Sequence, residues 1–247
     1  MGCASRKNGE KERMKIDGLS AAVSEFVKTV GGEDIPESNT ARCADFLFRG
    51  EGVIAELKTL EEEAVREHSL KLQARVHEWM RRGRVIVYGR TTLELQKMPA
   101  DCQTEWLNIL QPPVENIVRD ANRQIRSTKE IQELTTAKGL LLISNEGNLL
   151  YETPADYLSV VSRVLQKKTE HGDLRFADIN AVVYLSIRAV RNGMLPVWQA
   201  GFCDMADQQL REFVNSLERQ WFTYLSRGRL IFEKKSPDGG YLPMRRE

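Results

Sequence analysis

The sequence has 247 residues, and its hydrophobic share of 41% and charged share of 29% are close to globular averages, which argues against disorder and against a coiled-coil rod. Its net charge of +1 argues against a protein that coats nucleic acid through bulk electrostatics, but it leaves room for a local basic face. Because no apolar run approaches the ~20 residues of a membrane span and the start lacks the apolar core of a signal peptide, we expect a cytoplasmic protein with no membrane partner.

The amino-terminal part predicts a tail, one helix and a loop. Residues 1–16 are polar and of mixed charge, which is typical of a loose tail. Apolar residues then recur at helical spacing over 19–30, and Gly31-Gly32 would end that helix. The stretch 33–40 is polar and contains a proline, so we expect a loop there.

Two short apolar pieces, 44–48 and 53–57, predict the strands of a β-hairpin. The residues between them, Arg49-Gly50-Glu51-Gly52, are turn formers. If the hairpin turns symmetrically about Gly50-Glu51, Asp45 lies directly opposite Glu56 on one face of the sheet.

The middle of the chain predicts a long amphipathic helix and then a short strand. Over 61–82 acidic residues stand at the start, and Arg81-Arg82 precede Gly83, which is typical of a helix end. The apolar stripe of this helix consists of Val65, Leu72, Val76, Trp79 and Met80. Residues 85–88 are typical of a strand, and 93–95 of its partner.

Two further helices and a buried strand are expected next. A short helix over 102–110 would end at Pro112-Pro113, because a proline inside a helix removes a hydrogen bond and clashes with the preceding turn. A long helix then runs from about 114 to 136. The fully apolar segment 139–143 predicts a buried strand.

The carboxy-terminal third again alternates between helix and strand patterns. Pro154 is typical of a helix start, and Asn192-Gly193 is a strong two-residue hairpin signal. We expect a turn at 145–148, a helix over 154–168, strands over 179–187 and 195–202, and a helix over 205–226.

Helices that alternate with strands, together with at least two hairpins, predict an α/β (α+β) fold with a central mixed β-sheet flanked by helices. We expect a single domain over 17–235 with a helical and hairpin insertion around 61–112. A carboxy-terminal tail over 236–247 would follow.

The hairpin carries the pattern that indicates chemistry. Residues two apart in a strand face the same way, so Glu56 and Lys58 project to one side and Leu57 projects toward the core. Two carboxylates directly opposite each other repel, and a bound cation would turn that cost into a binding site. Mg²⁺ (or Mn²⁺) is expected, since it accepts one or two carboxylates together with phosphate oxygens. Lys58 would then position a water or neutralise charge, which predicts hydrolysis of a phosphodiester.

Asp45, ten intervening residues and Glu56-Leu57-Lys58 on a hairpin followed by a helix resemble the PD-(D/E)XK nuclease superfamily, whose fold is restriction-endonuclease-like. The resemblance extends over 44–59 and to the strand 139–143 behind a long helix. It implies that Asp45 and Glu56 bind the metal with the backbone carbonyl of Leu57, and that Lys58 is the catalytic lysine.

The sequence departs from the superfamily in two places. Ala44 stands where the proline of the motif is found, and no clear strand precedes Asp45, where the superfamily has one. Members often carry an extra acid before the motif, and the candidates here are Glu25 and Glu37.

Several basic residues and one amide are candidates for contacts to nucleic acid. Gln124 falls on the apolar stripe of the long helix, so it either bonds to backbone as a structural residue or lies near the metal site. The basic candidates either contact phosphates or form solvated helix faces. They are Lys71, Arg75, Arg82, Arg84, Arg123 and Lys129.

The sequence leaves two functions open. The first is a metal-dependent nuclease that cleaves DNA, in defence or repair. The alternative is a catalytically inactive nuclease fold that acts as a nucleic-acid-binding or protein-interaction module, because a fold does not guarantee its chemistry. Whether the chain forms a homodimer stays open.

Overall fold

The computed structural model describes residues 18–36, 41–61, 66–86, 97–148, 151, 153–190 and 193–226. Its helices are α1 (Leu19–Thr29), α2 (Arg66–Arg81), α3 (Ala100–Ile131), α4 (Pro154–Leu165) and α5 (Gln208–Ser226). Its strands are β1 (Glu33–Asp34), β2 (Phe46–Phe48), β3 (Val53–Glu61), β4 (Lys138–Glu146), β5 (Ala181–Val190) and β6 (Gly193–Phe202). No helix in these ranges is both long and apolar enough to cross a bilayer.

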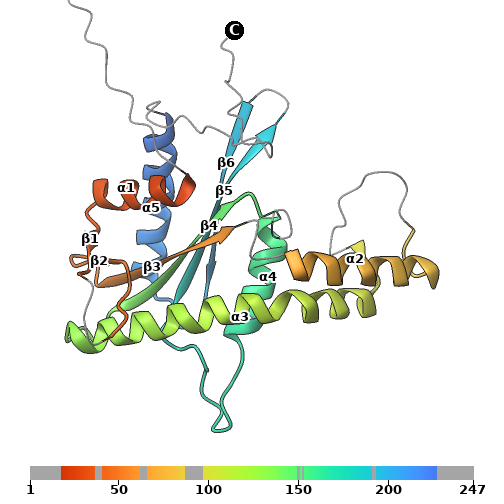
Figure 1. The fold of residues 1–247 in the computed structure, drawn as a ribbon. Coiled ribbons are helices and arrows are strands. Elements are labelled where there is room, and N and C mark those ends of the chain that lie inside the picture. The colour runs from red at the N-terminus through yellow and green to blue at the C-terminus, as the bar shows by residue number, and fades with distance from the viewer. Residues whose placement is uncertain are drawn as a thin grey trace, which may run out of the picture.

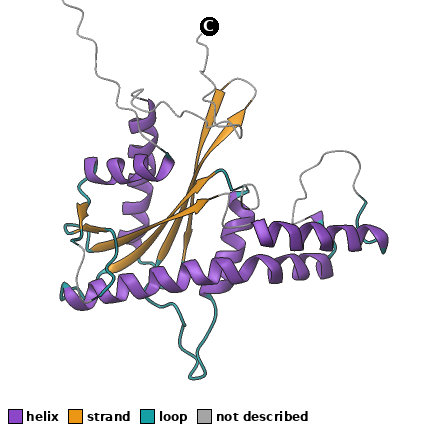
Figure 2. Cartoon of the chain, in the orientation of Figure 1, coloured by secondary structure: helices purple, strands orange, loops and turns teal. Residues whose placement is uncertain are grey.

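The strands form one mixed sheet in the order β1-β2-β3-β4-β5-β6, which confirms the α/β fold class (Figures 1 and 2). The central pairs β3–β4 and β4–β5 are parallel, and the outer pairs are antiparallel. Parallel strands are usually covered on both faces, and the buried run from Gly139 to Asn145 in β4 fits that rule.

Helices cover both faces of the sheet, as Figure 1 shows. On one face Ile54, Leu141 and Ile143 pack in the cluster that contains buried residues of α3 and α4. On the other face Ala55 and Leu142 pack in the cluster that contains those of α1 and α5. Side chains on both faces of β3 are therefore buried, including Ile54 and Glu56 on the face opposite Ala55.

The expected break at Pro112-Pro113 is wrong, because α3 runs through both prolines as a single helix of 32 residues. The buried positions Trp106, Leu110, Val114 and Val118 are each four residues apart and continue across the prolines. Packing of this stripe against the sheet and α4 offsets the local cost of the missing N–H groups, because tertiary context overrides helix propensity.

The expected start of the helix after the hairpin is also wrong at its first residues. β3 extends to Glu61, and α2 begins at Arg66 and ends at Arg81, next to Gly83 in the left-handed region at φ 67°. Met80 was expected inside but is 39% exposed, because α2 packs against α3 along a narrower stripe centred on Trp79.

Four strand and turn predictions differ from the structure. The expected strand at 85–88 is absent at Val85 and Ile86, and the rest of it and its partner lie outside the described residues. The loop at 33–40 contains the short strand β1, which is too short to show a period-two pattern. Val190 pairs with Gly193, so Gly193 belongs to β6 and not to the turn. The turn expected at 145–148 starts later, because Asn145 and Glu146 extend β4.

The tails at 1–16 and 236–247 lie outside the described residues.

Candidate active site

The hairpin adopts the register that the sequence predicts. Phe46 pairs with Ala55, and Phe48 pairs with Val53. Continued by one residue, this register sets Asp45 opposite Glu56. The two carboxyl groups interact electrostatically, since the charge of Asp45 is one cause of the raised pKa of Glu56.

The β2–β3 ladder ends at the point where it reaches these carboxylates. In a continued ladder the N–H of Ala44 would bond to Leu57, but it donates to Thr128 Oγ1 at 2.8 Å. The N–H of Leu57 donates instead to Asp45 Oδ2 at 2.7 Å. Because the N–H and C=O of one strand residue point to the same side, the carbonyl of Leu57 lies on this open edge beside Asp45.

Glu56 is a buried carboxylate, with 1% of its surface exposed. Oε1 lies 2.6 Å from Lys58 Nζ, whereas Oε2 is buried and has no hydrogen-bond partner. Burial first and the charge of Asp45 second raise the pKa of Glu56 from 4.5 to about 7, against the opposing effect of Lys58. An unpartnered buried oxygen next to a second carboxylate is an arrangement that a bound cation would stabilise.

Gln124 joins the catalytic lysine candidate to the backbone before the motif. Its Oε1 accepts a hydrogen bond from Lys58 Nζ at 2.7 Å, and its Nε2 donates to the carbonyl of Cys43 at 3.0 Å. This buried amide therefore bonds to backbone and also contacts Lys58 of the candidate site. Helix α3 thus sets the position of the Lys58 ammonium.

A cleft of about 940 Å³ opens over this group. Its floor includes Asp45, Glu56 and Lys58. The other lining residues are Ser24, Lys28, Asp34, Ile35, Ala41, Arg42, Cys43, Ala44, Phe46, Leu57, Thr59 and Gln124. The predicted residues Asp45, Glu56, Leu57, Lys58 and Gln124 therefore come together in one accessible hollow.

Neither of the two candidate auxiliary acids is found at the site among the described residues. Glu25 does not line the cleft, where α1 instead presents Ser24 and Lys28. Glu37 lies outside the described residues. Sequence reasoning missed Asp34 and Arg42, because no spacing rule links a polar residue in a loop or an edge strand to a motif on another strand.

The few oxygen donors of this site suit Mg²⁺ or Mn²⁺, which need only part of their ligands from the protein. Within the described ranges no group of three or more His, Cys, Asp or Glu residues is placed to hold a metal. Asp45, Glu56 and the carbonyl of Leu57 offer hard oxygen donors, and Mg²⁺ usually retains several waters beside one or two carboxylates.

The basic residues expected to contact phosphate lie away from the cleft. On α2 and just after it, Arg75 pairs with Glu105 at 3.3 Å, Arg82 pairs with Glu78 at 2.5 Å, and Arg84 pairs with Asp101. These contacts join α2 and its carboxy-terminal end to the first turns of α3, or stay within α2. Lys71 is an exposed residue of the same helix.

The two basic neighbours of Gln124 on α3 also have acidic partners. Arg123 pairs with Asp120 at 3.2 Å, and Lys129 pairs with Asp178 at 3.1 Å. Neither lines the cleft. Their charges are therefore partly balanced within the protein.

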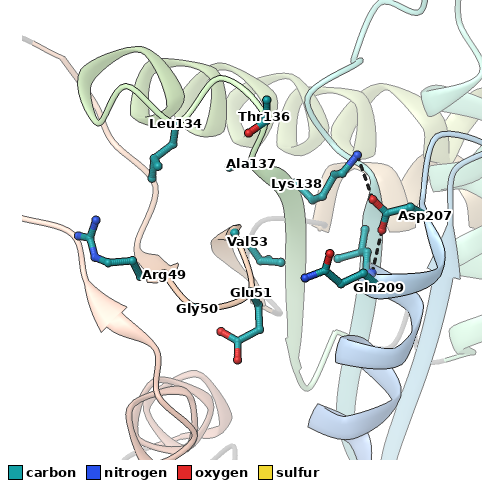
Figure 3. A pocket seen from close by; sticks show the side chains of 12 residues that line it. Arg49, Gly50, Glu51, Val53, Leu134, Thr136, Ala137, Lys138, Asp207 and Gln209 are labelled. Carbon is teal, nitrogen blue, oxygen red and sulfur yellow. Dashed lines mark hydrogen bonds and ion pairs between the residues drawn. The ribbon is translucent and has the colours of Figure 1, made fainter.

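A second hollow, of about 320 Å³, lies where the β2–β3 turn faces the start of α5 (Figure 3). Of its two cations, Arg49 pairs with Glu33 at 3.4 Å and Lys138 pairs with Asp207 at 3.2 Å. Asp207 also accepts the N–H of Leu210 at 2.9 Å. None of its lining residues has a buried polar atom without a partner. It lacks the unsatisfied groups that distinguish the first cleft.

Comparison with known proteins does not indicate an activity for this chain. No family model matches the chain, and no solved structure matches it. A protein of Aquifex aeolicus (strain VF5), called "Uncharacterized protein", is 27% identical over 151 residues. The match covers 58% of this chain and 53% of that protein, so the chain spans about half the length of this relative.

Proposed function

We propose that the protein is a metal-dependent phosphodiester hydrolase of the PD-(D/E)XK type that cleaves DNA, in defence or repair. The observation that carries the proposal is the pair Asp45 and Glu56 at the open end of the hairpin. One of their oxygens, Glu56 Oε2, is buried without a partner beneath a cleft. The ion pair of Glu56 with Lys58 satisfies only Oε1, so the burial of the ionised carboxylate costs stability that a bound cation would offset.

The ligands for Mg²⁺ or Mn²⁺ would be Asp45, Glu56 and the carbonyl of Leu57. A bound ion of this kind acidifies a water and withdraws charge from a phosphate. The hydrogen bond from the N–H of Leu57 holds Asp45 in place, and burial beneath α3 holds Glu56, so neither carboxylate needs to reorganise.

Lys58 would act on the phosphate itself. Its ammonium has three N–H donors, and two of them are engaged by Glu56 and Gln124. The third is left for an oxygen of the scissile phosphate or for the attacking water. Lys58 would thereby neutralise negative charge that develops during hydrolysis.

The state of the thiols supports a cytoplasmic setting. Within the described ranges Cys43, Cys102 and Cys203 are all free thiols, which is usual in a reducing compartment. We therefore propose that the protein acts in the cytoplasm.

The test is cleavage of plasmid and single-stranded DNA by the purified protein in Mg²⁺ or Mn²⁺. We expect Glu56→Ala and Lys58→Ala to lose cleavage. Glu51→Ala, an exposed acid of the same hairpin, serves as the matched control and should keep it. Equal cleavage by all four proteins would refute the assignment. Binding of DNA without cleavage by the wild type would favour a catalytically inactive nuclease fold.

A further inference from the structure

Three cations line the candidate cleft, and they differ in their partners. Lys28 pairs with Asp34 at 2.8 Å, and Lys58 is engaged by Glu56 and Gln124. Arg42 is exposed and forms no ion pair or hydrogen bond with any side chain in the described part of the chain. Among the described residues, Arg42 is therefore the cation of the cleft whose charge no acid balances.

The backbone directly after Arg42 is held by hydrogen bonds at residues 43–45. On one side, the carbonyl of Cys43 accepts Gln124 Nε2, and the N–H of Ala44 donates to Thr128 Oγ1. On the other, the carbonyl of Asp45 accepts the N–H of Ile35 at 2.9 Å. The segment is thus fixed between α3 and the stretch after β1, which keeps Arg42 at the cleft and three residues from the first metal ligand.

The chemistry of the floor does not require a further cation for one phosphate. Two carboxylates, a divalent ion and Lys58 are enough to hold and neutralise a single phosphodiester. A guanidinium matches the geometry of phosphate through two parallel hydrogen bonds. An arginine with no acidic partner among the described residues, placed beside these groups, is therefore suited to another phosphate of the same nucleic-acid chain.

We propose that Arg42 anchors a phosphate next to the one that is cleaved, so that the cleft selects polynucleotide chains over isolated phosphodiesters. This inference rests on the proposed function and adds to it the residue by which the cleft recognises a polymer. Arg42 would bind the polymer and would take no part in breaking the phosphodiester bond.

The test measures binding separately from cleavage. A short fluorescein-labelled single-stranded DNA is titrated in CaCl₂, and fluorescence anisotropy gives the Kd over a series of salt concentrations. Arg42→Ala should weaken binding about tenfold, because a charge-assisted contact is lost. It should also reduce the slope of log K against log salt by about 0.7, the value for one phosphate contact on a single strand.

Arg163→Ala is the matched control, since Arg163 is an exposed cation of α4 that does not line the cleft. It removes the same charge and should leave both Kd and slope unchanged. Arg42→Lys should restore the slope, because a point charge still displaces counterions, but only part of the affinity. Equal behaviour of the Arg42→Ala and Arg163→Ala proteins would overturn the inference.

A second substrate separates this inference from the proposed function. Bis(4-nitrophenyl) phosphate carries a single phosphate, so its hydrolysis in Mn²⁺ should be unchanged in Arg42→Ala, while KM for the oligonucleotide rises and kcat is kept. Parallel loss on both substrates would place Arg42 at the reacting phosphate and overturn the inference. Arg42-dependent binding by a wild type that hydrolyses neither substrate would support the anchor and refute the hydrolase.

Discussion

Replacing Glu56 by Gln should make the metal-free protein more stable above neutral pH. A free glutamate ionises at 4.5, but folding raises the pKa of Glu56 to about 7. The folded protein therefore keeps the proton in a range where the unfolded chain has released it. Stability contributed by this group is intact below 4.5 and is lost as the pH rises through about 7.

The size of the effect follows from that rise in pKa. Each pKa unit corresponds to about 1.4 kcal/mol, so ionised Glu56 costs the folded state about 3 kcal/mol above pH 7. This is a large part of the total stability of a domain, about 5–15 kcal/mol. Gln at this position keeps an oxygen for Lys58 and turns an N–H group toward the carboxylate of Asp45, so the repulsion is replaced by a hydrogen bond.

The assay is urea denaturation followed by tryptophan fluorescence, in EDTA, from below pH 4.5 to above pH 7. The free energies of unfolding of the wild type and Glu56→Gln should coincide at the acidic end and diverge steadily toward the alkaline end. Glu51→Gln, which changes an exposed acid of the same hairpin, should follow the wild type throughout. Parallel curves for the wild type and Glu56→Gln would refute the reasoning.

Three further outcomes are expected. Millimolar MnCl₂ should raise the Tm of the wild type but not of Asp45→Asn, because a cation that binds only the folded state stabilises by mass action; equal shifts in both would count against the site. Thr128→Val should lower the free energy of unfolding by about 1–3 kcal/mol, since the buried N–H of Ala44 loses its acceptor. Thr104→Val, which removes an exposed hydroxyl of α3 that donates to the carbonyl of Ala100, should cost less. Trp79→Ala should cost about 3–5 kcal/mol by unpacking α2 from α3 yet leave the Mn²⁺ shift of Tm in place, and loss of that shift would tie α2 to the metal site.

Local patterns in the sequence determined the hairpin and its register. The apolar residues of 44–48 and 53–57 and the glycines between them allow one symmetric pairing, and that pairing is the one observed. Helix positions marked by Gly83 and Pro154 were likewise predicted, because backbone restrictions at glycine and proline act without distant partners. The opposition of Asp45 and Glu56 follows from these local rules alone.

Other features depended on partners that are distant in the sequence. Whether α3 continues through Pro112-Pro113 was decided by packing of its buried stripe on the sheet and α4, which local propensity does not contain. The surroundings of Glu56 were decided in the same way. Its burial, which is the largest cause of its raised pKa, comes from α3 covering β3, sixty-six residues away at the contact between Lys58 and Gln124.

The composition of the cleft was also a tertiary outcome. Lys28 and Arg42 reach it from α1 and from a loop, and no periodicity marks either residue, whereas the conspicuous basic residues of α2 are paired with acids. The sequence by itself therefore determined which two acids face each other, since strand alternation and turn geometry are local. Only the tertiary structure decided that Glu56 is buried, that Lys58 links it to an amide on α3, and that both acids line one cleft. Burial and charge compensation are set by residues that folding brings together.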